Sequence, residues 1–304
     1  MFRNLMRCLP ENAVGGRDMS LIVKGETDTG RVRDHNEDQY LALGRDQSPP
    51  GAGALLVVAD GMGGQPAGEV ASLMAVQHIE ERFRSGGLTS VDDKDLEEAL
   101  RELLGDVNRA VLTAGQEPDK RGMGTTCTLV IIKGQQLYFS HVGDSRAYLL
   151  RDGQLNQITT DHSWVEEAVA TGTMTREEAR IHPNRNVITR AIGLDADLKV
   201  DTGNVSLQQG DLILLCSDGL NSMIPDEDIL KTLQESSTDT VCANLIKAAN
   251  DAGGRDNTSV VIAVVGEHAG VQMPITDPAT KDTVDIGLRP SLWGRARRFV
   301  FRRK

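Results

Sequence analysis

The chain has 304 residues, 39% of them hydrophobic, which is enough to bury a full core, and no apolar run approaches the roughly 18 residues of a membrane-spanning helix. Its formal net charge is −11, and removing the seven basic charges from Arg289 onward leaves −18 on the preceding 288 residues. A body this acidic repels nucleic acid and attracts cations, and with 3% aromatic residues it offers no base-stacking surface. We therefore expect no nucleic-acid partner.

The cysteines and the N-terminus indicate a reducing compartment. The four cysteines form no CxxC pair and three lie in apolar runs, a pattern typical of buried free thiols (Cys8, Cys127, Cys216 and Cys242). Within the N-terminal extension, 1–20, polar residues and Pro10 interrupt the apolar positions, so there is no secretory signal core. We expect a cytoplasmic protein.

The first half of the chain predicts a strand, two helices and then a group of strands. The apolar run 55–59 predicts a buried strand that ends on Asp60-Gly61, and amphipathic helices follow at 67–83 and 95–114. Four short apolar runs come next, separated by glycine-containing connections (runs 125–132, 137–142, 147–150 and 155–158; connections 133–134, 143–144 and 152–153). Such tight connections favour antiparallel hairpins.

The second half begins with a polar, charged insertion, 161–186, which we expect either to cover a site or to bind a partner. The pattern then predicts further strands and one helix before the last strand ends at Val265 (strands 198–201, 211–216 and 259–265; helix 241–249). Strands and helices come in blocks rather than in alternation. This order favours an α+β fold with antiparallel sheets.

The composition changes after Val265. Residues 267–290 are rich in Pro, Thr and Asp and predict a flexible linker. The tail 291–304 has apolar residues on one helical face and arginines around the other, so it predicts a basic amphipathic helix. Two interpretations stay open: a solvated tail, or a contact with an acidic partner or with the inner membrane surface. The body, 21–266, would be a single catalytic domain.

Several acidic residues lie next to predicted strands and suggest a shared cluster. Asp60 and Asp218 end apolar runs, Asp256 precedes one, and Glu37 and Asp38 form a fourth group. Two carboxylates about 4 Å apart repel by roughly 4 kcal/mol at an effective dielectric near 20, so converging acids need protons or cations. Oxygen ligands without Cys or His favour Mg²⁺ or Mn²⁺ over Zn²⁺.

Seven motifs, in this order, resemble those of the metal-dependent protein serine/threonine phosphatases of the type-2C family, in its bacterial form. The resemblance covers roughly residues 21–266, and the motifs are RDHNED (33–38), VADGMGG (58–64), GTT (124–126), VGDSRA (142–147), TRAIG (189–193), SDGL (217–220) and GRDN (254–257). The resemblance implies a four-layer α-β-β-α sandwich with two antiparallel sheets and two Mn²⁺ or Mg²⁺ ions at one end. The implied reaction is hydrolysis of phosphoserine and phosphothreonine on proteins.

The resemblance also implies a role for each site residue. Asp60 would bridge both metals, and the Gly61 carbonyl would bind one of them. Asp218 and Asp256 would complete the ligands of the other metal, Glu37 and Asp38 would hold metal-bound waters, Asp144 would bind a weaker third ion, and Arg33 would bind substrate phosphate. These roles agree with the chemistry: paired metals acidify a water, and the planar guanidinium fork of arginine suits phosphate.

One position departs from many eukaryotic members, which have His where this chain has Met62. Methionine cannot protonate a leaving alcohol, so the general acid is left unassigned. The histidines show no ligand spacing, and Arg190 has an expected structural role in a salt bridge.

Two alternative functions follow from the same residues. An aspartyl-phosphate-forming phosphatase needs a second Asp two positions after the first, but Met62 and Leu220 occupy these positions. A catalytically inactive phosphoprotein-binding regulator would lack a metal-binding acid, but all of them are present. The expected partners are phosphorylated proteins, including a Ser/Thr kinase and its substrates.

Overall fold

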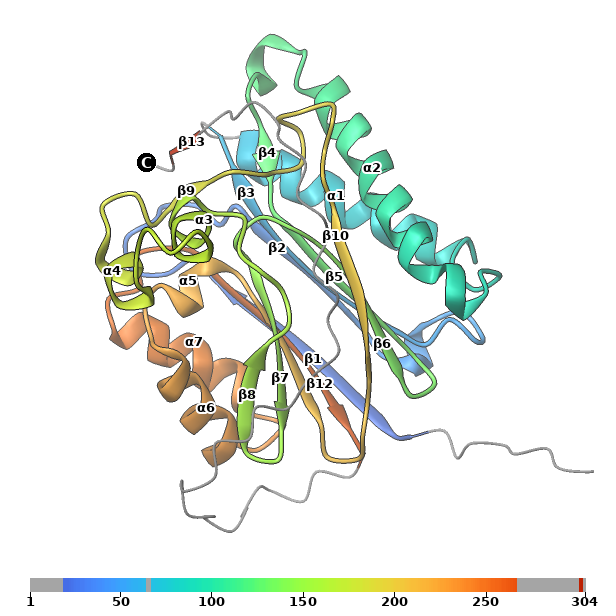
Figure 1. The fold of residues 1–304 in the computed structure, drawn as a ribbon. Coiled ribbons are helices and arrows are strands. Elements are labelled where there is room, and N and C mark those ends of the chain that lie inside the picture. The colour runs from blue at the N-terminus through green and yellow to red at the C-terminus, as the bar shows by residue number, and fades with distance from the viewer. Residues whose placement is uncertain (1–18, 64–66, 267–300, 303–304) are drawn as a thin grey trace, which may run out of the picture.

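The structure, a computed structural model, describes residues 19–63, 67–266 and 301–302. Two antiparallel sheets stack face to face (Figure 1). The five-stranded sheet has the order β1-β12-β11-β7-β8, with bounds Leu21–Asp28, Thr258–Val265, Leu212–Cys216, Arg146–Arg151 and Gln154–Gln157. The six-stranded sheet has the order β10-β6-β5-β3-β2, with bounds Asp201–Ser206, Gln136–Val142, Cys127–Lys133, Ala54–Met62 and Asp38–Leu43, and β4 (Gly124–Thr125) pairs with β3.

Helices cover the outer face of each sheet, which gives the four layers (Figure 1). The six-stranded sheet is covered by α1 (Ala67–Arg84) and α2 (Leu96–Ala114). The five-stranded sheet is covered by α5 (Asp218–Asn221), α6 (Asp226–Glu235) and α7 (Val241–Asp251). Short 3-10 helices lie at Arg45–Gln47, Asp93–Asp95 and Pro118–Lys120. The α-β-β-α sandwich predicted from the motifs is confirmed.

Three apolar clusters follow these layers. One lies between the six-stranded sheet and its helices, one between the sheets, and one between the five-stranded sheet and its helices. Two interior strands, β3 and β12, are buried along their whole length because both of their faces are covered, which explains the long apolar run in each. Cys127, Cys216 and Cys242 are free and buried, as predicted, and burial raises the pKa of each thiol. No helix in the described part of the chain could cross a membrane.

Two predicted strand features were wrong. Residues 198–200 lie outside any strand, and β10 instead starts at Asp201. This strand reads DTGNVS because it is the edge of its sheet and is half exposed, so it carries no apolar run. The connection 143–144 does not form a hairpin, because β6 and β7 belong to different sheets. At Gly143 and Asp144 the chain crosses from one sheet to the other.

The structure adds two helices to the insertion and corrects part of the predicted tail helix. Two short helices, α3 (Trp164–Ala170) and α4 (Arg176–Ile181), form within the insertion, which returns through β9 (Val187–Ile188). Residues Phe301–Arg302 form β13, an antiparallel strand against β9, so a helix through these two residues is wrong. The N-terminal extension, the linker and the rest of the predicted tail helix lie outside the described residues.

Candidate metal centre

Asp60 lies near the end of β3 and faces Asp38 of β2 in the antiparallel register. Both its backbone N–H and its carbonyl form hydrogen bonds with the residues Thr125 and Thr126, directly before β5. Its N–H donates to Thr126 Oγ1 at 2.9 Å, and its carbonyl accepts from the Thr126 N–H at 2.9 Å and from Thr125 Oγ1 at 3.1 Å. The two threonines therefore fix the position of the acid that we expect to bridge two metals. Sequence reasoning placed them in a motif without assigning this role.

Gly61 lies where the chain has no room for a side chain. A Cβ at this position would be 2.2 Å from the Gly68 carbonyl oxygen and 2.6 Å from that of Glu37. The Gly61 N–H donates to the Glu37 carbonyl at 3.1 Å, which ties β3 to the segment before β2. The Glu37 carboxylate lies against Gly68 in the first turn of α1, where the helix dipole favours negative charge.

Asp38 shows most directly that the acids converge. Its side chain is 2% exposed, and its Oδ2 accepts a hydrogen bond from Ser217 Oγ at 2.7 Å. Burial raises its pKa to about 7; hydrogen bonds from Ser217 and Ser259 oppose this, and the charges of Asp218 and Asp256 add to it. Asp38 Oδ1 has no hydrogen-bond partner among the described residues. A buried carboxylate oxygen of this kind beside two further acids fits a cation.

Asp218 and Asp256 reach the same place from the five-stranded sheet. Asp218 is 5% exposed and begins α5, separated from the end of β11 by Ser217 alone. The Ser217 N–H donates to the Ser259 carbonyl at 3.0 Å, and the Ser259 N–H donates to Ser217 Oγ at 2.9 Å. Asp256 precedes β12, and its Oδ2 accepts from Arg33 Nη2 at 2.8 Å. The arginine expected to bind phosphate is thus adjacent to an expected metal ligand.

Asn257 connects these segments, and sequence reasoning assigned it no role of its own. Its Oδ1 accepts from the Glu37 N–H at 2.8 Å, and its Nδ2 donates to the carbonyls of Thr29 at 2.9 Å and His35 at 2.8 Å. The side chain is buried. A polar residue directly before a strand that is buried along its whole length was the available signal, because a buried amide needs backbone partners.

Asp144 lies at the crossing between the sheets and is 5% exposed. The next residue connects it to the rest of the centre, since Ser145 Oγ lies 2.8 Å from Thr126 Oγ1, the atom that also binds the Asp60 backbone. A hairpin at this position would have kept Asp144 within one sheet. The crossing instead brings it to the end of the sandwich.

The predicted acids do not form a closed cage. Within residues 19–63 and 67–266, no three Asp, Glu, His or Cys side chains are arranged to hold one ion by themselves. Mg²⁺-type ions keep several waters and take only one or two carboxylates, so an open acidic centre still suits them. The individual ligand roles of Asp60, Gly61, Asp144, Asp218 and Asp256 stay predictions.

Met62 packs in a small apolar cluster with Ile188 and Ala191. Its surroundings therefore agree with the expectation that it takes no part in proton transfer. Because Ile188 belongs to β9, the cluster also places the end of the insertion beside the last residue of β3.

The sequence model described as "Protein phosphatase 2C" matches residues 31–251, more than half of the chain. The chain belongs to the protein phosphatase 2C family. It is 40% identical over 238 residues to "Serine/threonine phosphatase stp" of Listeria monocytogenes, covering 78% of this chain and 92% of that protein. It is 36% identical over 251 residues to "Protein phosphatase PhpP" of Streptococcus pneumoniae, covering 80% and 96%.

Solved structures of other phosphatases show the same fold. The serine/threonine phosphatase of S. agalactiae aligns with a TM-score of 0.75 at 35% identity, covering 81% of this chain and 100% of that one. The catalytic domain of the serine/threonine protein phosphatase PstP, in complex with two manganese ions, aligns with a TM-score of 0.70 at 37% identity, covering 82% and 100%. Membership of the protein phosphatase 2C family thus supports dependence on divalent metal ions.

Proposed function

We propose that this chain hydrolyses phosphoserine and phosphothreonine on proteins, using water and divalent cations held by its acidic centre. The observation that carries the proposal is the convergence of Asp38, Asp218 and Asp256 within a chain that matches the phosphatase family. Burial raises the pKa of Asp38, and the charges of Asp218 and Asp256 add to that rise. Acids from β2, α5 and the segment before β12 meet at one end of the sandwich. Such a charge cluster favours cation binding.

Each acid has a proposed task. Asp60 and the Gly61 carbonyl would hold the paired ions, with Asp218 and Asp256 completing one of them. Glu37 and Asp38 would orient waters, and Asp144 would hold a weaker third ion. Bound Mn²⁺ or Mg²⁺ would supply an acidified water and neutralise charge on the phosphoryl oxygens.

Arg33 would bind the substrate phosphate. Its side chain is 31% exposed, so the guanidinium is reachable from solvent, while the bond to Asp256 keeps it at the centre. A guanidinium has five N–H donors, so it can keep one partner and still offer others to a phosphate. This arrangement supports phosphate binding by Arg33. Because the proposed attacking group is water, the reaction needs no protein nucleophile.

The alternatives are less well supported. An aspartyl-phosphate mechanism would need an acid at the position of Leu220 or Met62, and both side chains are buried and apolar. A catalytically inactive regulator is disfavoured because Asp60, Asp218 and Asp256 are all retained.

The proposed substrates are proteins phosphorylated by a bacterial Ser/Thr kinase, together with the kinase itself. Acidic substrates would be repelled by the body of the protein, which favours phosphosites flanked by basic residues. A contact of residues 291–304 with an acidic partner or a membrane surface is part of the proposal, and it concerns a segment that lies almost wholly outside the described residues.

The test is hydrolysis of a phosphothreonine peptide with Mn²⁺, with Mg²⁺ and with chelator. We expect activity only with a divalent ion, and we expect Asp218→Asn to lower turnover by about 100-fold because a ligand charge is lost. Asp239→Asn is the matched control, since the same change falls on an exposed acid paired with Lys24. Full activity after removal of divalent ions, or in Asp218→Asn, would refute the proposal.

A further inference from the structure

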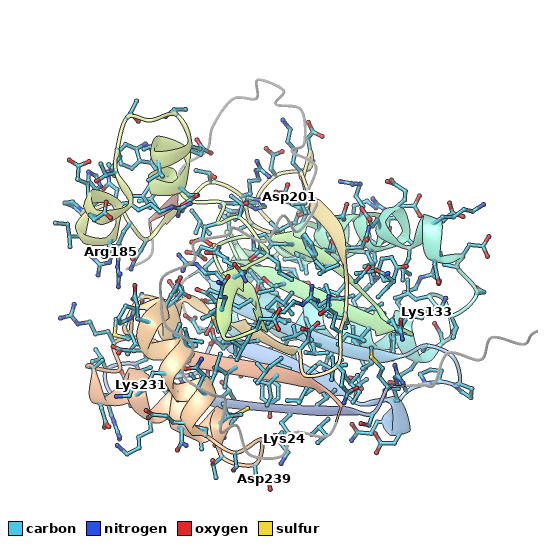
Figure 2. The ribbon with its side chains drawn as sticks, turned by 60° about the horizontal axis from the view of Figure 1, so that its bottom comes forward. Lys24, Lys133, Arg185, Asp201, Lys231 and Asp239 are labelled. Atoms are coloured by element: carbon cyan, nitrogen blue, oxygen red, sulfur yellow. The ribbon has the colours of Figure 1, made fainter. Side chains whose placement is uncertain are left out.

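The predicted insertion 161–186 corresponds in the structure to the segment 163–188, which backbone contacts close at its base. The Thr189 N–H donates to the His162 carbonyl at 2.7 Å, and Ser163 forms an antiparallel bridge with Ile188. We call these flanking residues, His162 with Thr189 and Arg190, the neck of the insertion. In Figure 2, Asp201, the first residue of β10, lies between Arg185 of the insertion and Lys133 at the end of β5.

His162 contacts the sheet crossing through both backbone groups of Gly143. The Gly143 N–H donates to His162 Nδ1 at 3.1 Å, and the His162 N–H donates to the Gly143 carbonyl at 2.7 Å. Gly143 has a φ of 114°, and a Cβ there would be 2.5 Å from the Thr126 side chain. The contacts with His162 therefore hold Gly143, the residue before Asp144, in a conformation that only glycine adopts readily.

The tautomer of His162 follows from these contacts. Because Nδ1 accepts from Gly143, the proton of the neutral ring is on Nε2, which lies 3.1 Å from Asp201 Oδ2. Arg190 Nη1 lies 3.0 Å from Nε2 and can only donate, so its partner is Asp201 Oδ1 at 2.9 Å. The ring is thus clamped between the Gly143 N–H and the Asp201 carboxylate.

The charge state agrees with this geometry. Burial lowers the pKa of His162, and the nearby Arg190 charge lowers it further, although the hydrogen bond to Asp201 opposes both. Burial would raise the pKa of Asp201, but the hydrogen bond from His162 and the charge of Arg190 oppose it, and that pKa lies below its usual value. A neutral imidazole and an ionised carboxylate therefore persist across the neutral pH range.

We propose that His162 is a positioning residue that holds the Gly143-Asp144 crossing at the metal centre and joins it to the other two residues of the neck, Thr189 and Arg190. His162 is buried, so it orients Asp144 through the backbone without touching substrate. The inference rests on the proposed function, because it assigns a metal to Asp144. It adds a residue outside the acidic cluster to the determinants of metal affinity.

Two substitutions test the two nitrogen atoms of the His162 ring separately. In His162→Asn, an amide oxygen can take the place of Nδ1 and accept from Gly143, whereas in His162→Gln the amide reaches the place of Nε2 and the Gly143 N–H loses its acceptor. We expect His162→Gln to raise the Mn²⁺ concentration for half-maximal activity by about tenfold, the scale of a lost orienting contact, and His162→Asn to raise it by less than about threefold. KM for phosphopeptide at saturating Mn²⁺ should change little in either variant.

Calorimetric titration of the full-length protein with Mn²⁺ gives a readout apart from activity. We expect His162→Gln to weaken the same binding phase that Asp144→Asn removes, and the double variant to be no worse than Asp144→Asn alone. Should His162→Gln unfold, Asp201→Ala tests the same clamp at a side chain that is 33% exposed, and it should weaken that phase in the same direction.

The outcomes are separable. Equal Mn²⁺ affinity in wild type, His162→Gln and Asp201→Ala would overturn the inference, and so would equal effects of the Asn and Gln substitutions. A wild-type protein that neither binds Mn²⁺ nor hydrolyses phosphopeptide would instead overturn the proposed function. Thermal unfolding of each variant shows whether lost affinity reflects a lost fold.

Discussion

Asn257 shows how one side chain can organise a site without being a ligand. It forms three hydrogen bonds to the backbone of the segment 29–37, which also carries Arg33 and Glu37. Arg33 and Asp256 are 223 residues apart in the sequence. They pair here because Asn257, the neighbour of Asp256, anchors the segment 29–37 that carries Arg33. The hydrogen bonds of Asn257 to the backbone therefore determine where the side chains of Arg33 and Glu37 can act.

We expect Asn257→Ala to destabilise the fold by about 1–3 kcal/mol, because buried backbone groups lose their partners. Peptide hydrolysis should also fall under conditions in which the variant is still folded, since the segment that carries Glu37 is released. Urea unfolding and peptide hydrolysis measure the two effects. The matched control is Asn204→Ala, at an exposed position on β10, which should change stability by less than about 0.5 kcal/mol. Equal effects of the two substitutions would contradict the organising role.

At the scale of the element, two similar connections behave differently. The turn between β7 and β8 has positive φ at Asp152 and Gly153, 50° and 77°, as a two-residue hairpin requires. Gly143-Asp144 has a comparable composition but links strands of different sheets. Composition predicts that the chain turns. Which strand it then joins depends on the packing of β7 against β11 and of β6 against β5.

The short pair formed by β9 and β13 should add little stability. Two residues of strand can form only a few hydrogen bonds, each worth about 0.5–1.5 kcal/mol net, while ordering a residue costs about 1–2 kcal/mol. β9 is also held on its other side by the Ser163 bridge. We expect deletion of residues 301–304 to shift the melting temperature by less than about 3 °C.

Thermal unfolding and hydrogen exchange at Val187 and Ile188 check this expectation. Ser163→Ala is the comparison, because it removes the N-cap of α3 and should cost about 1 kcal/mol. A loss of stability on deletion larger than that of Ser163→Ala would mean that the tail supports the insertion.

At the scale of the whole molecule, burial of histidine couples folding to pH. Burial and the neighbouring His162 lower the pKa of His141 to about 3, while Asp161 and Asp201 act in the opposite direction. The folded protein therefore keeps this ring neutral, whereas the unfolded chain protonates it at its ordinary value of 6.5. Stability should be fully present above pH 6.5 and should decrease as the pH falls from there toward 3, by up to about 1.4 kcal/mol per pH unit.

Urea unfolding between about pH 5 and 6.5 measures this slope. In His141→Gln the side chain can still donate to the Thr160 carbonyl but cannot titrate, so the slope should become shallower even if overall stability falls. His35→Gln, at an exposed position, should leave the slope unchanged. The same slope in wild type and His141→Gln would rule out the linkage.

The sequence alone determined the apolar runs that become β3, β11 and β12, the amphipathic helices α1 and α2, and the identity of the acidic motifs, because these depend on local periodicity and on residue chemistry. Three features depend on tertiary packing: β10 is a polar edge strand, the chain changes sheets at Asp144, and the side chains of Asn257 and His162 bind the backbone of distant segments. These features arise from contacts between residues far apart in the chain. No local pattern encodes them, because each depends on which surfaces are already covered when the sheets pack.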